Sequence, residues 1–433
     1  LTNAQKKAVA EIQKDLSSGS PMNRLLQGDV GSGKTIIAAL AAAIIIQNDA
    51  QAAIMAPTSI LAEQHFRSMH NFLGSETDPK LPLTKEEIRL LTGDTSAKDR
   101  EEIKQGLLDG TVKLIIGTHA LIEDPVQFKN LQLAIIDEQH RFGVAQRAAL
   151  RKKGSNPHLL VMTATPIPRS LALTLYGDLE LSIMDEMPAG RKPVDTYVLN
   201  PLERERAYQL VRSNIDKGHQ AFIVYPLIEQ GDNDEVKSAV EDQKILQKEV
   251  FPEFKVGLLH GRMSPDEKEN VMKSFRDKDF QILVSTTVIE VGVDIPNASV
   301  MMIEGANRFG LAQLHQLRGR VGRGDEKAIC LLLPDTEDAL ENERLKVMTE
   351  TNDGFVLAEK DLQQRGPGDF IGYRQSGFSD LRMAHITDIR LIEKARNIAE
   401  ELFSEDPQLT KPENALLLSK VSEFWHSENS DMS

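Results

Sequence analysis

The chain has 433 residues, which is enough for two or three domains of about 100–200 residues each. Apolar residues make up 40 % and charged residues 27 %, as in most globular proteins, and a single cysteine, Cys330, excludes an internal disulfide and a cysteine-cluster metal site. The formal net charge of −14 argues against a uniformly basic nucleic-acid-binding protein, but a basic groove can lie on an acidic chain.

Over the first 335 residues, short apolar runs alternate with longer amphipathic segments, a pattern typical of a parallel sheet covered by helices. The apolar run Ile36–Ile46 predicts a buried helix, because it is shorter than the roughly 20 residues that span a bilayer. In the first half of this region the predicted strands are Asn23–Gln27, Ala52–Ala56, Leu114–Ile116, Ala134–Ile136 and Leu159–Met162.

The alternation pauses at Met187–Pro193, where Pro and Gly predict a linker, and then resumes. Within the second half, the charged segment Asp232–Gln247 predicts a solvated helix or a mobile insertion. The predicted strands of this half are Ala221–Tyr225, Val256–Leu259, Gln281–Ser285, Val300–Glu304 and Ile329–Leu333. We therefore predict two α/β lobes, at residues 1–188 and 194–335.

The remaining residues, 336–433, are charged and have helical patterns. They are interrupted by a glycine-rich segment, Arg365–Gly377, which reads RGPGDFIGYRQSG. We predict a third, smaller helical element with this loop between its helices. An ordinary structured loop is the alternative to a functional one.

A phosphate-binding loop is predicted between the first strand and the apolar helix. The segment reads GDVGSGKT, a complete pattern whose glycines let backbone N–H groups close around phosphates at a helix N-terminus. Lys34 would reach the β- and γ-phosphates of ATP, and the hydroxyl of Thr35 would ligate Mg²⁺. The predicted nucleotide-binding residues of this loop are Gly28, Gly31, Ser32, Gly33, Lys34 and Thr35.

Asp137 and Glu138 follow the predicted strand Ala134–Ile136. A carboxylate at the C-terminal end of a parallel strand faces the ligand crevice. Asp137 suits the coordination sphere of Mg²⁺, and Glu138 suits activation of an attacking water. An acidic pair after a strand is as often a helix cap, but beside a phosphate loop it predicts the catalytic carboxylates.

The segment Asp137–Arg147, DEQHRFGVAQR, resembles the DExH box of superfamily 2 helicases in the version of the RecG family. Other segments resemble this family's motifs in the same order along the chain. They are Leu1–Gln5, Ala56–His65, Gly117–His119, Thr163–Arg169, Leu259–Met263, Ser285–Pro296, Gln316–Arg323 and Asp361–Gly377. The resemblance covers nearly the whole chain and implies two RecA-like parallel-sheet lobes in tandem, followed by the small helical element.

The resemblance also implies further residues of the nucleotide site. Gln5 would read the adenine, and Gly292 and Asp294 would contribute from the second lobe. Arg320 and Arg323 would reach the γ-phosphate from that lobe and stabilise the transition state. Surface salt bridges are the alternative for these two arginines.

For DNA, the resemblance implies contacts between phosphates and Thr58, Thr118 and Thr286, although threonines are also common in strands and helix caps. No metal site is expected at His140 or His315, because no partner ligands lie at metal spacing. The residues implied to couple ATP hydrolysis to DNA movement are His140, Thr163, Thr165, Arg365, Arg374 and Gln375.

The resemblance implies a double-stranded DNA translocase or helicase that uses ATP and Mg²⁺. Its implied substrates are stalled replication forks and Holliday junctions, which it would regress and migrate in recombination and repair. We expect a monomer in the bacterial cytoplasm, associated with the nucleoid and with single-stranded DNA-binding protein, and no membrane. A transcription-repair coupling factor, an RNA helicase and a non-catalytic nucleotide-binding module are the alternatives. The family's N-terminal wedge domain has no counterpart in this sequence, which starts at Leu1, so a fragment or a processed form is expected.

Overall fold

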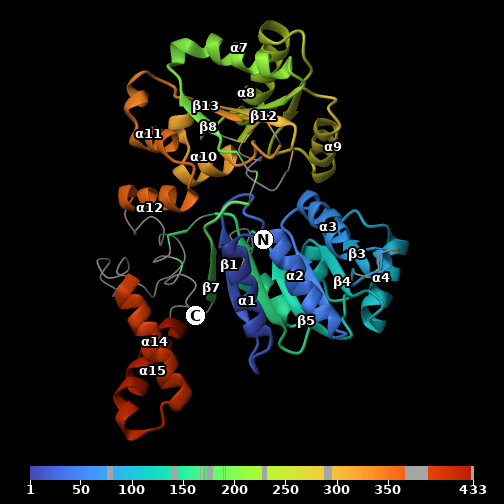
Figure 1. Ribbon diagram of the computed structural model, residues 1–433, viewed down its shortest axis with the longest axis vertical. Coiled ribbons are helices and arrows are strands. Elements are labelled where there is room, and N and C mark those ends of the chain that lie inside the picture. The colour runs from blue at the N-terminus through green and yellow to red at the C-terminus, as the bar shows by residue number, and fades with distance from the viewer. Residues whose placement is uncertain are drawn as a thin grey trace. The chain divides into compact units, whose positions relative to one another are not determined.

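The structure is a computed structural model that describes residues 1–75, 81–138, 144–165, 167–168, 172, 179–188, 190, 192–226, 232–286, 295–324, 326–365 and 389–430. The chain divides into two compact units, one of residues 1–166 and 180–357, the other of residues 167–179 and 358–433. The larger unit contains two parallel sheets, which define lobe 1 and lobe 2 (Figure 1).

Lobe 1 is built on a seven-stranded sheet in the order β3-β4-β2-β5-β6-β1-β7, in which every pair of neighbouring strands is parallel. The helices α1 and α2 pack against each other on this sheet (Figure 1). The strands are β1 (Asn23–Gly28), β2 (Gln51–Met55), β3 (Ile88–Leu91), β4 (Leu114–Gly117), β5 (Leu131–Ile136), β6 (His158–Thr163) and β7 (Glu180–Met184). The described helices are α1 (Asn3–Leu16), α2 (Lys34–Gln47), α3 (Ser59–Leu73), α4 (Ala97–Asp109) and α5 (Val144–Arg151).

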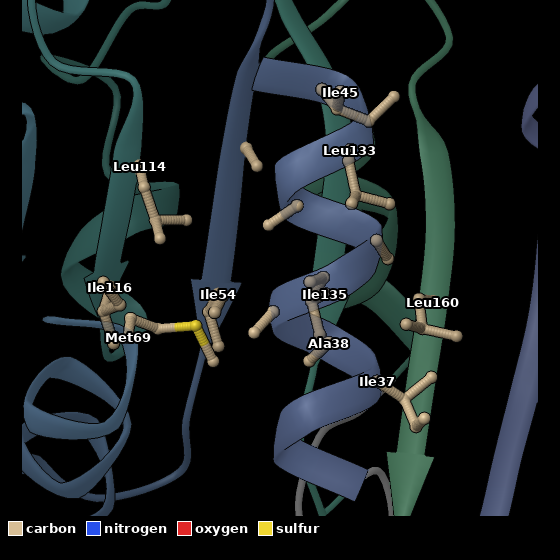
Figure 2. Packing of buried hydrophobic residues seen from close by; sticks show 14 of the residues in the cluster. Ile37, Ala38, Ile45, Ile54, Met69, Leu114, Ile116, Leu133, Ile135 and Leu160 are labelled. Atoms are coloured by element: carbon tan, nitrogen blue, oxygen red, sulfur yellow. The ribbon is translucent and has the colours of Figure 1, made fainter. Parts of the chain in front are cut away.

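The core of lobe 1 holds α2 against the sheet. This helix is apolar almost throughout, and its Ile37 and Ala38 are fully buried (Figure 2). They belong to one cluster with Ile54, Ile135 and Leu160 of three neighbouring strands. A helix that is apolar on all sides is stable only in such an interior. The burial of α2 therefore fixes its N-terminus, and with it the preceding loop, at the carboxyl edge of the sheet.

Lobe 2 is built on a six-stranded parallel sheet in the order β10-β11-β9-β12-β13-β8. Aromatic pairs anchor both of its apolar clusters, with ring centroids 5.0 Å apart for Phe222 and Phe275, and 5.5 Å apart for Tyr208 and Phe251. The strands are β8 (Asp195–Val198), β9 (Gln220–Val224), β10 (Val256–Leu259), β11 (Ile282–Ser285), β12 (Ala298–Glu304) and β13 (Ile329–Leu333). The described helices are α7 (Arg204–Ile215), α8 (Asp232–Ile245), α9 (Pro265–Arg276), α10 (Leu311–Arg318) and α11 (Glu343–Glu350).

Helix α12 (Gly354–Arg365) runs from the larger unit into the smaller one, which also contains α14 (Ile389–Glu405) and α15 (Ala415–Ser430). The turn between the last two helices is organised by Asp406. Its carboxylate accepts hydrogen bonds from Nδ2 of Asn414 (2.8 Å) and from the N–H groups of Lys411 and Thr410 (2.9 Å each). These bonds, that of Asn414 first, lower the pKa of Asp406 to about 2. In the part of the chain that the structure describes, no helix is both long and apolar enough to cross a membrane.

The predicted fold class is confirmed, with two RecA-like parallel-sheet lobes followed by a small helical element. Each predicted strand is present, and the apolar run Ile36–Ile46 lies in the buried helix α2. The prediction missed β3, β7 and β8, which are edge strands whose partly exposed residues interrupt the apolar pattern. The charged segment Asp232–Gln247 is a helix, but it is not simply solvated, because Leu246 is buried in the lobe 2 core. The domain bounds 1–188, 194–335 and 336–433 stay a prediction.

One contact between the lobes is expected to weaken as the pH rises. Ile60 of α3 packs against the apolar cluster of lobe 2, and Glu63, also on α3, shares a hydrogen bond with Glu269 of α9. This bond, then burial and the charges of Glu63, Asp94 and Asp266, raises the pKa of Glu269 from 4.5 to about 7. The folded chain therefore binds this proton more tightly than the unfolded chain. The stabilisation that this proton gives the folded chain is complete below the pKa of Glu269 in the unfolded chain. It is lost as the pH rises through the pKa of Glu269 in the folded chain.

The measurement is the midpoint of thermal unfolding between pH 5 and 8, for the unmodified chain and for Glu269→Gln. As the pH rises, we expect the midpoint of the unmodified chain to fall relative to that of Glu269→Gln. The glutamine carries no charge that could repel Glu63, and the charge of Glu63 is balanced by Arg67, whose guanidinium nitrogen lies 3.0 Å from its carboxylate. Glu123→Gln, which removes a carboxylate paired with Arg100 within lobe 1, is the matched control. Identical pH profiles for all three proteins would contradict the assignment.

Candidate nucleotide site

The predicted phosphate loop connects β1 to α2. Gly31 and Gly33 have φ angles of 77° and 88°, a left-handed conformation that other residues rarely adopt. The loop encloses Lys34, the first residue of α2, which is 9 % exposed. Its Nζ donates to the carbonyl oxygens of Gly28 (2.8 Å) and Asp29 (2.9 Å). The loop thus holds an ammonium group at a helix N-terminus, an arrangement suited to an anionic ligand.

Gln5 of α1 contacts this loop directly. Its Nε2 donates to the carbonyl oxygen of Ser32 (2.9 Å), and its Oε1 accepts from the N–H of Thr2 (2.9 Å). A Cβ on Gly33 would lie 2.5 Å from the same Nε2, so the contact also requires glycine at that position. An amide group has two donors and two acceptor sites, so Gln5 retains one of each for a base. Its contact with adenine stays a prediction.

The acidic pair follows β5 at the carboxyl edge of the sheet. Burial favours the neutral form of Asp137, but a 2.7 Å contact with Nε2 of His65 and the charge of Lys34 outweigh it, so the pKa of Asp137 lies below its ordinary value. Burial and the charge of Asp137 raise the pKa of Glu138. Glu138 also has a positive φ of 52°, and its Oε2 accepts from the N–H of Ala164 (3.4 Å). The two neighbouring carboxyls therefore have opposite pKa shifts, as is common for pairs with separate roles.

Two arginines of lobe 2 face this site. Arg320 is 3 % exposed, and its charge opposes the rise in the pKa of Glu138. Burial lowers the pKa of Lys34, the neighbouring carboxylates oppose this shift, and the charge of Arg323 adds a smaller lowering effect. The arginines are thus not a solvated surface cluster, although their role at a γ-phosphate stays a prediction.

The segment that carries these arginines packs directly on lobe 1. A Cβ on Gly319 would lie 2.9 Å from Cβ of Val30 in the phosphate loop, so only glycine permits this approach. Gln316 donates from Nε2 to the hydroxyl of Thr165 (2.7 Å), and the N–H of Thr165 donates to the hydroxyl of Thr163 (3.2 Å). The predicted coupling threonines therefore lie between the lobe 2 segment and the acidic pair.

The corresponding place in lobe 2 holds an ion pair. β5 and β12 are both fourth in their sheet orders, and each is followed by a left-handed residue, Glu138 (φ 52°) and Gly305 (φ 56°). In lobe 2 the strand ends on Glu304, whose carboxylate is bound by Nε (3.1 Å) and a terminal nitrogen (2.9 Å) of Arg204. The lobes thus repeat one architecture, but among the described residues the end of the fourth strand carries a carboxyl pair in lobe 1 and an ion pair in lobe 2.

The threonines predicted to touch DNA phosphates fall into two groups. Thr58 caps α3, and its hydroxyl accepts from the N–H of that helix's third residue (3.3 Å). Thr118 and Thr286 follow β4 and β11, the second strands of their sheets, and their N–H groups donate to Leu91 and Leu259 (3.3 Å each). Among the described residues, the buried hydroxyls of Thr118 and Thr286 have no hydrogen-bond partner. Such groups are rare in folded proteins and are available to a ligand.

Several predicted residues lie in parts of the chain that the structure does not describe. His140, Gly292, Asp294, Arg374 and Gln375 lie outside the described residues. Arg365 is the last residue of α12, but its side chain is likewise not described.

The sequence did not single out four residues that the structure brings to the site. His65 contacts Asp137, while Asp29, His315 and Arg318 form a buried chain of contacts between the lobes. For His315 the sequence raises only the possibility of a metal ligand, and Asp29 occupies a variable position of the phosphate-loop pattern. A histidine or carboxylate inside a helicase motif was the only available signal, and it does not identify a partner far away in the sequence.

Known protein families match the chain along most of its length. The DEAD/DEAH box helicase family matches residues 2–174, the helicase conserved C-terminal domain matches residues 203–325, and the C-terminal part of domain 3 of the ATP-dependent DNA helicase RecG matches residues 351–431. The RecG helicase of Thermotoga maritima is 53 % identical over 96 % of this chain. That of Synechocystis is 50 % identical over 94 % of it. A solved structure of RecG bound to a three-way DNA junction is 49 % identical, with a TM-score of 0.74 over 91 % of this chain.

The chain belongs to the RecG family. It aligns with 48 % of the Synechocystis protein, 52 % of the Thermotoga maritima protein and 50 % of the chain in the junction complex, and so spans about half the length of these RecG proteins. The family-specific match at residues 351–431 lies beyond both sheets and includes the predicted glycine-rich loop.

Proposed function

We propose that this chain is the motor of a double-stranded DNA translocase that hydrolyses ATP between its two lobes. One observation carries the proposal. Arg320 and Arg323 of lobe 2 face Glu138 and Lys34 of lobe 1 within a single chain. Because both lobes would contribute to one ATP site, binding and hydrolysis of ATP would change the arrangement of the lobes.

The chemistry follows from the placement of these groups. The loop N–H groups and Lys34 would hold the phosphates, and Glu138 would take a proton from the attacking water. The arginines would stabilise the charge that develops on the transferred phosphoryl group. Thr35 and the ionised Asp137 supply oxygen ligands of the kind Mg²⁺ prefers, and the ion would neutralise phosphate charge when bound.

Movement requires that ATP favours one arrangement of the lobes. A ligand shifts a conformational equilibrium only by its difference in affinity for the two states, and the arginines provide that difference, because they reach the phosphates only when the lobes are together. The contacts of Gln316 with Thr165 and of Ala164 with Glu138 would pass the nucleotide state to lobe 2.

The DNA contacts are proposed at equivalent places in the two lobes. The hydroxyls of Thr118 and Thr286 each lie after the second strand of a sheet, where they would bind successive backbone phosphates. Contacts with the phosphate backbone of DNA do not depend on the base sequence, and a translocase must move along any sequence. We extend the proposal to branched DNA, on which the chain would regress stalled forks and migrate Holliday junctions in recombination and repair. We also propose that it works as a monomer, cytoplasmic and nucleoid-associated, beside single-stranded DNA-binding protein.

The test compares the stimulation of ATP hydrolysis by linear duplex DNA, junction DNA and RNA, with the 433-residue chain. We expect stimulation by both DNAs, and more by the junction than by the linear duplex. Stimulation by RNA alone would overturn the assignment. Duplex stimulation without fork regression would favour the alternative of a transcription-repair coupling factor.

A further prediction concerns the glycine-rich loop. Replacing Arg365 and Arg374 together by alanine is expected to leave the rate of ATP hydrolysis nearly unchanged and to stop fork regression, because the arginines would bind phosphates of the moving duplex. The measurements are phosphate release and the conversion of a labelled model fork. Lys420→Ala, on α15, is the control for a lost charge in the same region. Unimpaired fork regression would remove the loop from the mechanism.

A further inference from the structure

Asp29 and His315 form a buried contact between the lobes that the mechanism above does not use. Asp29 lies in the phosphate loop and His315 in α10 of lobe 2. Their side chains are 8 % and 5 % exposed, and 2.5 Å separates Oδ1 of Asp29 from Nε2 of His315. Burying a carboxylate is costly unless it is paired. The pair is therefore an energetically important contact between the phosphate loop and lobe 2.

A third residue fixes the protonation of this histidine. A guanidinium nitrogen of Arg318 lies 3.1 Å from Nδ1 of His315. Because arginine can only donate, Nδ1 must accept, and the ring proton must be on Nε2, where it donates to Asp29. His315 is thus a neutral bridge between a buried cation and a buried anion.

Both ends of this series of three side chains, Asp29, His315 and Arg318, form hydrogen bonds with the protein backbone. The carboxylate of Asp29 also accepts from the N–H of Val30 (2.6 Å), and its carbonyl accepts from Lys34 (2.9 Å). At the other end, Arg318 donates to the carbonyl oxygens of Met348 (2.8 Å) and Thr351 (2.9 Å), just before α12. A change in the phosphate loop would therefore reach the start of α12 through three side chains.

We propose that Asp29 and His315 are positioning residues, which set the arginine segment of lobe 2 against the phosphate loop for ATP hydrolysis. Their side chains contact each other, Arg318 and the N–H of Val30. They would act through Arg320 and Arg323, which follow His315 by five and eight residues. This inference rests on the proposed function. It predicts that the pair controls the rate of hydrolysis more than the binding of ATP, since Lys34 and the loop N–H groups remain in place.

The experiment uses the whole chain with three single variants. Asp29→Asn removes the charge and keeps the size, and His315→Leu removes both ring contacts. His315→Gln is the conservative variant, because its amide can donate to Asp29 and accept from Arg318. We expect kcat of His315→Leu to fall about 10- to 100-fold, as for a small misplacement of catalytic groups. We expect the kcat of Asp29→Asn to lie between those of the unmodified chain and His315→Leu. We expect His315→Gln to regain a large part of the lost kcat. In all three variants the KM for ATP should change little.

The double variant Asp29→Asn with His315→Leu tests whether the two residues act as one unit. We expect its kcat to match that of His315→Leu within about twofold, whereas independent residues would show multiplied losses. His219→Gln, a partly buried histidine elsewhere in lobe 2, is the control. Multiplied losses, an unchanged kcat in His315→Leu, or an equal loss of ATP affinity would overturn the proposal.

A spectroscopic readout does not depend on turnover. In the nucleotide-free chain labelled with ¹⁵N-histidine, we expect the signal that is lost in His315→Gln to come from a neutral ring with its proton on Nε2, and we expect this signal to shift in Asp29→Asn. A proton on Nδ1 would contradict the chain of contacts. If the unmodified chain hydrolyses no ATP, the proposed function fails while this readout still tests the pair. If it hydrolyses ATP and the variants match it, only the inference fails.

Discussion

Replacing Glu138 by glutamine is expected to leave ATP binding nearly unchanged and to lower the rate of ATP hydrolysis by about 10²–10⁴-fold. Glutamine has nearly the same shape, and its side-chain oxygen can still accept a hydrogen bond from the N–H of Ala164, but it cannot take a proton from water. The groups that would bind the nucleotide, Lys34 and the loop N–H groups, are untouched. The left-handed backbone of Glu138 (φ 52°) is no worse for glutamine, so folding should be preserved.

The measurements are the single-turnover rate with saturating Mg²⁺ and ATP, and the affinity for a fluorescent ATP analogue. Glu304→Gln is a demanding control, because Glu304 is also a buried carboxyl at the end of the fourth strand of its sheet. Its partner is Arg204, so we expect this change to affect thermal stability and not turnover. Hydrolysis by Glu138→Gln within about tenfold of the unmodified rate would remove Glu138 from its role.

The parts of the fold that could be predicted are those with a strong local pattern. The buried strands and α2 have apolar runs whose lengths separate strand from helix, and the glycine spacing of the phosphate loop has a direct steric cause at Gly33. β8 illustrates the limit. Its residues Asp195–Val198 are all partly exposed or exposed, so its place in the sheet depends on pairing with β13 and not on its own sequence.

The candidate site could be predicted only within single motifs. Lys34 is recognisable because it begins the helix after the glycine-rich loop, and the pair Asp137–Glu138 is recognisable because it directly follows an apolar strand. The contacts between motifs could not be predicted, because Asp29 and His315 are 286 positions apart and the pattern of one gives no information about the other. Opposite pKa shifts at Asp137 and Glu138 also depend on burial and on His65, which only the folded chain provides.

Removal of the lobe 2 arginines is the second change with a large expected effect. Arg323→Ala is expected to lower kcat by about 10³–10⁵-fold, because the charge developing on the transferred phosphoryl group loses its stabilising guanidinium. Arg323→Lys should recover only part of this loss, since lysine keeps the charge but not the planar fork of donors. Arg308→Ala, which breaks an exposed pair with Asp335 in the same lobe, is the matched control and should be silent.

The same variant decides whether the site is completed within one chain. The close approach of Gly319 to Val30 occurs within a single copy, so Arg323 should act on the Lys34 of its own chain. We therefore expect an equimolar mixture of Arg323→Ala and Lys34→Ala to be as inactive as either variant alone. If the site were built between two copies, mixed pairs would contain one intact site and would recover a quarter to a half of the activity. Recovery of that size would show that the motor works as an oligomer and would exclude the single-chain mechanism.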